Sequence, residues 1–443
     1  MIKNRADLVR VHGRHSSLVL SALEAAVKSV DPGALVRKSL SLRGGTLVAR
    51  DIKGKNVKIK GFNDAYVVGA GKASAAMAAA VARILKGRVA GGAINVPRGT
   101  DADVDRISIT RASHPVPDSK GVCGTKKIIE VLEKAKQDDL VVVVISGGGS
   151  ALMPMPARGL ALKDKQEATS ALLASGASIN EINAVRKHLS AVKGGQLVQH
   201  TRSRVLSLVL SDVVGDDLTV IASGPTFPDA TTFSDARQVL EKYGLTGTRA
   251  ARYIARGMQG AIKETPKPGD SIFARVSNVL IGNNELACKS ATDFLRRRKV
   301  RTEYLGSAFD GEARDFGAFM ARLAGDIKSK SPFALVAGGE TTVRLGKKPG
   351  KGGRNQEAAL ACALAGVEGV AGFIGTDGID GNSDAAGALV SCKSAELARK
   401  INAKRLLARH DSYRALEKMG SLIFTGYTGT NVNDIAIVYN PCQ

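Results

Sequence analysis

The sequence contains no tryptophan, and aromatic residues make up only 4% of its 443 residues. Stacking platforms for nucleic-acid bases are therefore scarce. Its five cysteines are widely spaced and include no C-x-x-C pair, which argues against a metal ion bound by paired cysteines and against a redox motif. We therefore expect reduced, mostly buried thiols.

Long apolar runs are also missing. The longest apolar strand, residues 140–145, is far too short to span a bilayer. The first 15 residues, MIKNRADLVRVHGRH, lack the apolar core of a signal peptide. By elimination, we expect a cytoplasmic protein that has no membrane partner.

Acidic residues are few relative to basic ones, and the formal net charge is +23. Such a charge attracts anions, which include both small anionic substrates and nucleic acid. The basic residues are scattered, with only short runs such as residues 296–299. This scatter and the scarcity of aromatic residues favour small anions over a specific nucleic-acid partner.

The chain is too long for one ordinary hydrophobic core, and two domains are expected. In the first half, apolar strands alternate with helices, as in the strand at residues 65–68 followed by a glycine turn and an alanine-rich helix to Leu85. The run at residues 140–145 is typical of a strand buried on both faces of a parallel sheet. We therefore predict a larger, doubly wound, Rossmann-like α/β domain.

A stretch with little apolar periodicity, residues 244–271, is predicted to hold the domain boundary. Beyond it the α/β alternation resumes, beginning with a strand at residues 275–281. The sequence therefore predicts an N-terminal domain over residues 1–250 and a smaller α/β C-terminal domain over residues 270–443.

Two glycine-rich loops follow predicted strands of the first domain. In parallel α/β sheets, ligands bind at the carboxyl ends of strands. Gly69-Ala70-Gly71-Lys72 offers backbone N–H groups and an ammonium to a phosphate, although it matches neither a Walker A loop nor a Rossmann fingerprint. Ser146-Gly147-Gly148-Gly149-Ser150 lets an anion approach the backbone closely. The alternatives are a tight turn with a solvated lysine and a flexible loop without a ligand.

Further polar side chains are expected near these loops. Ser178 and Glu181 form a predicted capping box, and the helix that follows is expected to run to the glycine pair at 194–195. Asn183, Arg186, Ser190 and Lys193 would then lie on one helix face, either lining the site or facing solvent. Asp212 and Asp216 follow the predicted strand at residues 204–210, where carboxylates could hold Mg²⁺, accept a proton or simply be surface acids.

The second half contains three more glycine-led polar loops, GGETT at 338–342, GGRNQE at 352–357 and GTDG at 375–378. Arg354 opens a predicted helix, a position suited to gripping a carboxylate or phosphate through two hydrogen bonds. Together these loops contain cations, phosphate-binding backbone and carboxylates. They show no convincing nucleophile–histidine–carboxylate triad, so the combination favours phosphoryl transfer.

Taken together, the motifs resemble the two-domain glycerate 2-kinase family, whose C-terminal half is called the MOFRL domain. The resemblance covers nearly the whole chain. It is carried, in order, by GAGKAS, SHPVPDSKG, SGGGSALMP, NEINAVRKHLSAVKGG, SDVVGDD, IASGPT, GGETTV, GGRNQE and GTDGIDGNSDAAGA.

The resemblance implies phosphorylation of D-glycerate at its 2-hydroxyl by ATP, with Mg²⁺, in a cleft between the domains. It also implies that Lys72 and Arg354 occupy the positions regarded as essential. Some members have been labelled hydroxypyruvate reductases, but this sequence has no dinucleotide fingerprint. The alternative functions are a hydroxypyruvate reductase and a glycerate kinase that gives 3-phosphoglycerate. The expected assembly is a monomer or a homodimer.

The resulting hypothesis assigns four roles. The expected catalytic residues are Lys72, Arg354 and Asp212. The expected ATP- and phosphate-binding residues are Gly69, Gly71, Ser146, Gly147, Gly148, Gly149, Ser150, Lys193, Gly339, Glu340 and Thr341. Substrate binding is expected from His114, Arg186 and Asn355, and metal binding from Asp212, Asp216 and Asp377.

Overall fold

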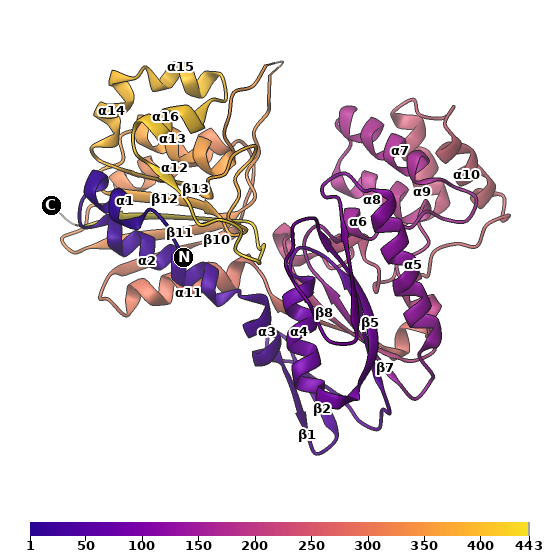
Figure 1. Cartoon of the computed structure of the whole chain (residues 1–443). Helices are drawn as coiled ribbons and strands as arrows, with labels where there is room; N and C mark the ends of the chain where they lie inside the picture. Colours follow the sequence, from indigo (N-terminus) through magenta and orange to yellow (C-terminus); the bar gives the residue numbers. More distant parts are fainter. Residues whose placement is uncertain (347, 442–443) are drawn as a thin grey trace. The chain divides into compact units, whose positions relative to one another are not determined.

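The computed structural model describes residues 1–346 and 348–441, which form two compact units. The central unit consists of Pro32–Gly282, and the terminal unit combines Met1–Asp31 with Asn283–Gln443. Figure 1 shows the strands and helices of each unit. Among the described residues, no helix has both the length and the apolar character that crossing a bilayer requires.

The central unit is built on a six-stranded parallel sheet with the order β6-β5-β4-β7-β8-β9. Every residue of β7 is buried, so both faces of the sheet are covered there, as its apolar sequence predicts. The strands are β4 (Ala65–Ala70), β5 (Val89–Pro97), β6 (Ile107–Ala112), β7 (Leu140–Ile145), β8 (Arg204–Leu210) and β9 (Val276–Gly282). The doubly wound α/β fold expected of this part of the chain is confirmed.

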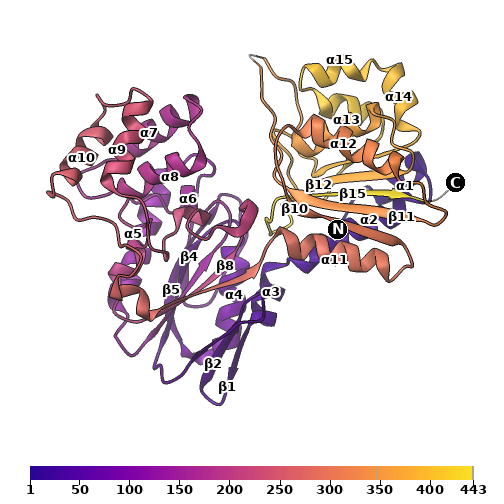
Figure 2. The same ribbon diagram turned by 180° about the vertical axis from the view of Figure 1, so that it is seen from behind.

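Helices complete the central unit. Those that pack on the sheet include α4 (Ser74–Leu85) and α5 (Ser119–Lys134), and a short α6 (Gly149–Leu152) follows β7. A second group has its own apolar core and lies apart from the sheet in Figure 2. Its members are α7 (Leu162–Ala174), α8 (Ile179–His188), α9 (Phe233–Lys242) and α10 (Arg249–Met258). The remaining elements are α3 (Pro32–Ser39), an antiparallel sheet of β1 (Leu40–Arg43), β2 (Thr46–Arg50) and β3 (Asn56–Ile59), and the 3₁₀ turns η1 (Lys86–Arg88), η2 (Gln196–His200), η3 (Val214–Asp216), η4 (Ile221–Ser223) and η5 (Ser271–Arg275).

The terminal unit is built on a six-stranded mixed sheet with the order β10-β11-β15-β12-β13-β14. Its strands are β10 (Arg301–Phe309), β11 (Phe333–Gly339), β12 (Val370–Gly375), β13 (Gly387–Ser391), β14 (Leu422–Ile423) and β15 (Asp434–Asn440). Its helices are α1 (Arg5–His12), α2 (Ser16–Ser29), α11 (Asn284–Arg296), α12 (Ala313–Asp326), α13 (Arg354–Leu364), α14 (Ser394–Lys400), α15 (Ala403–Ala408) and α16 (Ser412–Lys418). In Figure 1, α2 and α11 cover one face of this sheet and α12 and α13 the other.

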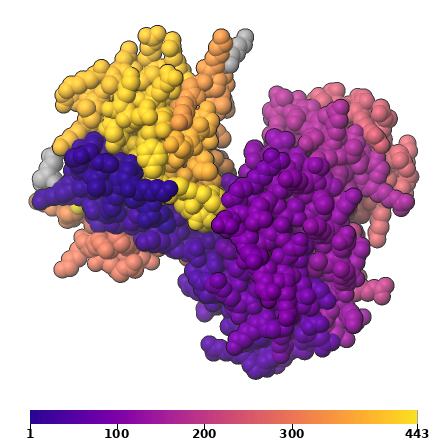
Figure 3. Space-filling view, in the orientation of Figure 1, coloured from indigo at the N-terminus to yellow at the C-terminus, as the bar shows by residue number. Residues whose placement is uncertain are grey.

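The two units differ from the expected ranges 1–250 and 270–443 at both ends of the central unit. The first 31 residues belong to the terminal unit because α2 packs its apolar face against α11, β12 and β15. Figure 3 shows this indigo segment lying against the yellow C-terminal part of the chain. At the other end, β9 pairs in parallel with β8 and so extends the first sheet, whereas it was expected in the second domain.

Two local predictions also need correction. The domain boundary was expected within residues 244–271, but residues 249–258 form the helix α10, and the apolar face of this helix packs against α9 and α7. Helix α8 begins with the predicted capping box but ends at His188, short of the glycine pair at 194–195. As for the cysteines, Cys288 and Cys362 are buried and free while Cys123 and Cys392 are exposed and free; Cys442 lies outside the described residues.

Candidate active site

The two glycine-rich loops of the central unit are bonded to each other. Because β4 and β7 are neighbours in the parallel sheet, both loops leave the same edge. The Lys72 N–H donates to the Gly147 carbonyl over 2.8 Å, and the Ala73 N–H donates to the Ser146 hydroxyl over 3.0 Å. The sequence predicted each loop, and the structure brings them together.

Glycine is required where the loops touch. Gly71 has φ +147°, and a Cβ added there would lie 2.6 Å from the Ser146 carbonyl oxygen. A Cβ on Gly69 would overlap the Val144 carbonyl. Since real Cβ atoms do not approach backbone oxygens so closely, any side chain at these positions would separate the loops.

Lys72 and His114 both reach the SGGGS loop. Gly148 has φ +82° and precedes α6, and a Cβ there would lie 3.0 Å from the His114 ring and 3.5 Å from the Lys72 Cγ. The His114 side chain is exposed and Lys72 is half-buried. Three residues from different predicted motifs therefore converge on one surface of the central unit.

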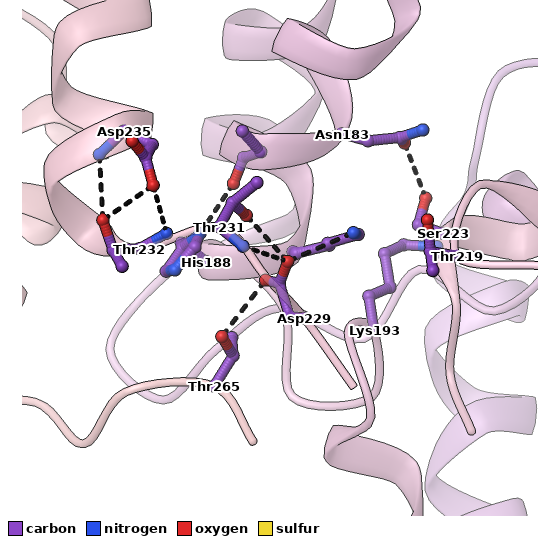
Figure 4. Close-up of polar contacts among 12 residues, drawn as sticks. Asn183, His188, Lys193, Thr219, Ser223, Asp229, Thr231, Thr232, Asp235 and Thr265 are labelled. Carbon is purple, nitrogen blue, oxygen red and sulfur yellow. Dashed lines mark hydrogen bonds and ion pairs between the residues drawn. The ribbon is translucent and has the colours of Figure 1, made fainter. Parts of the chain in front are cut away.

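A buried hydroxyl network continues from this loop. Ser150 and Ser223 lie 2.8 Å apart through their hydroxyl oxygens, and the Ser223 hydroxyl donates to Asn183 Oδ1 over 3.0 Å. The Lys193 ammonium donates to the Ser150 carbonyl over 3.0 Å. Figure 4 shows the Asn183 and Lys193 side chains approaching Ser223 from different elements. Ser223 was not among the expected site residues, although its loop, IASGPT, was noted.

Asn183 and Lys193 meet by a route that differs from the predicted helix face. After α8 ends, the chain turns at Gly194 and Gly195, both with positive φ, and their N–H groups donate to the carbonyls of Ser223 and Gly224. These bonds, rather than helical spacing, fix Lys193 beside residues 222–223, where its ammonium donates to the Ala222 carbonyl and Ser223 bonds to Asn183. Ser190 donates its hydroxyl to the Met155 carbonyl instead of joining the network.

Asp212 and Asp216 follow β8, the strand next to β7, and so lie at the same edge of the sheet as the SGGGS loop. Both are half-buried, and Asp216 has a positive φ of 56° within a 3₁₀ turn. In the described part of the chain, no group of three or more His, Cys, Asp or Glu side chains is placed to hold a metal ion.

The remaining expected residues gather in the terminal unit around Asp434. The antiparallel register sets Asp434 at the start of β15 opposite Gly339 at the end of β11 and Gly375 at the end of β12. Arg354, the first residue of α13, forms ion pairs of 2.6 Å with Asp434 and 2.7 Å with Glu340. The predicted cation is therefore held by two carboxylates.

Asn355 and a second acid extend this cluster. The Asn355 amide donates to Asp434 over 2.8 Å and to Asp380 over 3.2 Å. Asp380 also accepts from the backbone N–H groups of Asn355 and Gln356 at the start of α13. Asp380 and Asp434 were both missed by sequence reasoning. Asp380 stands in the GTDGIDGNSDAAGA motif, but nothing in that motif marks it as a partner of Asn355, and Asp434 stands in none of the quoted motifs.

Burial perturbs the titration of these acids. It raises the pKa of Asp434 to about 7, against the opposing effects of Arg354 and Asn355. Burial likewise raises the pKa of Asp380, although its bonds from Gln356 and Asn355 oppose this. Burial acts to lower the pKa of Arg354, but the charges of Asp434 and Glu340 outweigh it and raise that pKa.

Gly339, Thr341, Asn355 and Asp434 line a small cavity of about 10 Å³. A cavity of this size has room for about one water molecule, and a phosphate group would require the lining to open. Asp377 lies in the loop after β12, where its Oδ1 accepts from the Ile379 N–H and its carbonyl accepts from Thr428. The expected site residues thus form two groups, one in each unit.

Comparisons with known proteins agree on one family. The chain matches a domain of unknown function, DUF4147, over residues 18–256 and the MOFRL family over residues 333–434. A glycerate 2-kinase from Pyrococcus horikoshii is 39% identical over 424 residues, which cover 93% of this chain and 94% of that protein. This chain belongs to the glycerate 2-kinase family.

Two further similarities describe the family's range. The crystal structure of a glycerate kinase from Thermotoga maritima matches with a TM-score of 0.82 at 38% identity, covering 95% of this chain and 98% of that one. A relative from Agrobacterium vitis is 41% identical over 94% of this chain and 92% of its own length, and it carries hydroxypyruvate reductase as a provisional name. This chain and the Thermotoga maritima glycerate kinase therefore share one fold over nearly their full length.

Proposed function

We propose that this protein transfers the γ-phosphate of ATP to the 2-hydroxyl of D-glycerate, giving 2-phosphoglycerate and ADP. The observation that carries the proposal is the hydrogen bonding of the GAGK turn to the SGGGS loop. The aliphatic part of the Lys72 side chain lies beside Gly148 of that loop. Glycine-lined N–H groups and a cation at the carboxyl edge of a parallel sheet suit a phosphate.

In the proposed reaction, the glycerate 2-hydroxyl oxygen attacks the γ-phosphorus, the bond from that phosphorus to the bridging oxygen breaks, and ADP leaves. The hydroxyl proton passes to a carboxylate, for which Asp212 is the candidate. Lys72 stabilises the charge that develops on the transferring phosphoryl group, because positioning and charge neutralisation provide most of the catalysis in such transfers.

The remaining central-unit residues bind the two substrates in this proposal. The N–H groups and hydroxyls of Gly69, Gly71 and residues 146–150 hold the phosphates together with Lys193. His114 and Arg186 contact glycerate. In support, His114 lies beside Gly148 of the SGGGS loop, and the Lys193 ammonium donates to the Ser150 carbonyl at the end of that loop.

From the terminal unit, we propose that Arg354 contributes a cation and Asn355 a substrate hydrogen bond, and that Gly339, Glu340 and Thr341 bind phosphate. Arg354 is held by Glu340 and Asp434, so these carboxylates fix its orientation. Lys72 and Arg354 could exchange the roles of binding the phosphoryl group and binding the glycerate carboxylate.

Mg²⁺ is proposed as the accompanying cation. It usually takes one or two carboxylates and completes its shell with substrate phosphates and water, so Asp212 and Asp216, two acids beside the phosphate loops, suit it. Asp377 is the further candidate in the terminal unit. When bound, Mg²⁺ would neutralise charge on the nucleotide phosphates.

The proposal is tested by incubating the protein with ATP, MgCl₂ and D-glycerate in the presence of enolase, which accepts 2-phosphoglycerate directly. An increase in phosphoenolpyruvate supports the proposal. Product that appears only after addition of a phosphoglycerate mutase would instead identify 3-phosphoglycerate. Loss of NADH absorbance with hydroxypyruvate would identify a reductase.

We further propose that the protein acts in the cytoplasm on small-molecule substrates, without a specific nucleic-acid partner, as a monomer or homodimer. Salt-sensitive retention on nucleic acid at physiological ionic strength would contradict the second point.

A further inference from the structure

Three cations of the central unit lie within electrostatic reach of one another, and none of them forms an ion pair with a carboxylate of residues 1–346 or 348–441. They are Lys165 on α7, Arg186 on α8 and Lys193 in the turn that follows α8. Lys165 is 7% exposed and Lys193 is 2% exposed. Lys165 donates to the Met155 carbonyl over 3.2 Å, and Lys193 donates to the carbonyls of Ser150 and Ala222 over 3.0 and 3.4 Å.

A neighbouring lysine illustrates the usual solution for a buried charge. Lys187, 6% exposed, forms an ion pair of 3.2 Å with the fully buried Asp229. An unpaired charge in the interior is expensive, because carbonyl dipoles replace only part of its hydration. Lys165 and Lys193 are two such charges, and the half-buried Arg186 adds repulsion to their cost, so the cluster needs an explanation that folding alone does not supply.

The acids on the surrounding helices and on the loop after α10 are engaged elsewhere. Asp164 pairs with Arg249, Glu167 with Lys163, Glu181 with Lys242, and Glu264 with His188 and Lys267. Within the residues that the structure describes, the cluster therefore keeps its excess of positive charge.

The titration of the lysines reflects this environment. Burial, followed by the charge of Arg186, lowers the pKa of Lys165 to about 7. Burial, followed by the charges of Lys165 and Arg186, lowers the pKa of Lys193 well below its ordinary value. Without a nearby anion, both ammonium groups are therefore easier to deprotonate.

A fourth donor accompanies the cations. Asn183 stands one helical turn before Arg186 on α8, and its side chain is 3% exposed. Its Oδ1 accepts from Ser223, but its Nδ2 is buried without a hydrogen-bond partner. Buried amide groups are normally satisfied, so this free donor indicates a missing acceptor. Ser223 links Asn183 to Ser150, whose carbonyl accepts from Lys193.

We propose that Lys165, Arg186 and Lys193 form a subsite for an oxyanion of a substrate, either the carboxylate of the hydroxy acid or a phosphate of the nucleotide. The inference rests on the proposed function and deepens it by adding Lys165, which lies outside the recognised motifs. A bound oxyanion supplies the missing negative charge, accepts hydrogen bonds from the cations and favours their protonated forms. Binding near pH 8 should therefore take up protons from the buffer.

The test is isothermal titration calorimetry of the full chain with D-glycerate alone and with ATP alone. The variants are Lys165→Met and Lys193→Met, which keep similar volume without the charge. Lys163→Met is the matched control, because Lys163 lies on the same helix and is 81% exposed. We expect each cluster variant to bind one of the two ligands at least about tenfold more weakly, as loss of a charge-assisted hydrogen bond implies.

The outcomes separate the sources of the anion. Weaker glycerate binding assigns the subsite to the carboxylate, and weaker ATP binding assigns it to a phosphate. If both cluster variants bind both ligands as tightly as the control, the proposal is overturned. Should a variant fail to fold, the wild-type protein is titrated at pH 8 in buffers of different ionisation enthalpy. A binding heat that changes with the buffer, for either ligand, supports the subsite. Binding heats that are the same in every buffer, for both ligands, reject it.

The enolase-coupled assay keeps this inference distinct from the proposed function. A protein that fails to make 2-phosphoglycerate but loses anion affinity on Lys165→Met would retain the subsite and lose the kinase assignment. If the protein makes 2-phosphoglycerate but both substituted variants bind glycerate and ATP as tightly as before, the kinase assignment stands and the subsite is rejected.

Discussion

Replacing Arg354 with Met should remove turnover and also destabilise the terminal unit in a pH-dependent way. Arg354 is the cation that balances Asp434, and the pKa of Asp434 is raised to about 7 by burial. Removing one partner of a buried ion pair typically costs about 3–5 kcal/mol, because the other charge stays buried without compensation. The cost should fall as the pH drops, since Asp434 can then become neutral.

The sign follows from proton binding. Between about pH 4 and pH 7, folded Asp434 holds a proton that the unfolded chain has released, so the free energy of unfolding decreases as the pH rises through this range. Without Arg354 the proton is held more tightly still. We therefore expect Arg354→Met to lose about 3 kcal/mol of stability at pH 8.5 and clearly less at pH 5.5.

A double variant separates the two effects. Asp434→Asn removes the unpaired carboxylate, so Arg354→Met/Asp434→Asn should regain most of the stability at pH 8.5 and still lack turnover. Urea unfolding at both pH values and the enolase-coupled rate measure the two quantities. A stability loss that is equal at the two pH values would refute the electrostatic reasoning, and activity within about tenfold of wild type would reject the catalytic assignment.

Three further changes test other parts of the site. Lys72→Met should lower kcat by about 10²–10³-fold, with the melting temperature unchanged, and near-normal kcat would reject its role. Gly71→Ala should cost about 1–3 kcal/mol and weaken ATP binding because its Cβ meets the Ser146 carbonyl, whereas Gly99→Ala, with φ +79° and open space around it, should leave ATP binding unchanged. Since the pKa of Lys165 is lowered to about 7, the unfolded chain holds a proton above that pH that the folded chain has released, and Lys165 should contribute a rise in stability of about 1.4 kcal/mol per pH unit between about pH 7 and pH 10. Lys165→Met should reduce the slope of stability against pH by that amount in urea titrations, and an unchanged slope would contradict the assignment.

The buried strands could be predicted from sequence because their apolar runs leave little ambiguity. Strands β7 and β8 begin and end at the predicted residues, and the capping box of Ser178 and Glu181 is formed. The end of α8 could not be predicted in the same way. The glycine pair at 194–195 stops no helix; it forms a turn bonded to residues 223–224, which are distant in sequence.

The convergence of the GAGK and SGGGS loops was also within reach of sequence reasoning, because both follow strands of a parallel sheet. The partner of Arg354 was not. Asp434 is 80 residues away and reaches Arg354 only because β15 inserts antiparallel between β11 and β12. Lys165 likewise looks like an ordinary helix-surface lysine until the packing of α7 buries it.

The most direct test of the account is the rate at which the purified protein supplies enolase with substrate from D-glycerate and ATP. The account predicts that phosphoenolpyruvate forms without any added mutase and that Lys72→Met slows its formation by about 10²–10³-fold. Hydroxypyruvate-dependent oxidation of NADH, with no phosphorylated product from glycerate, would contradict it.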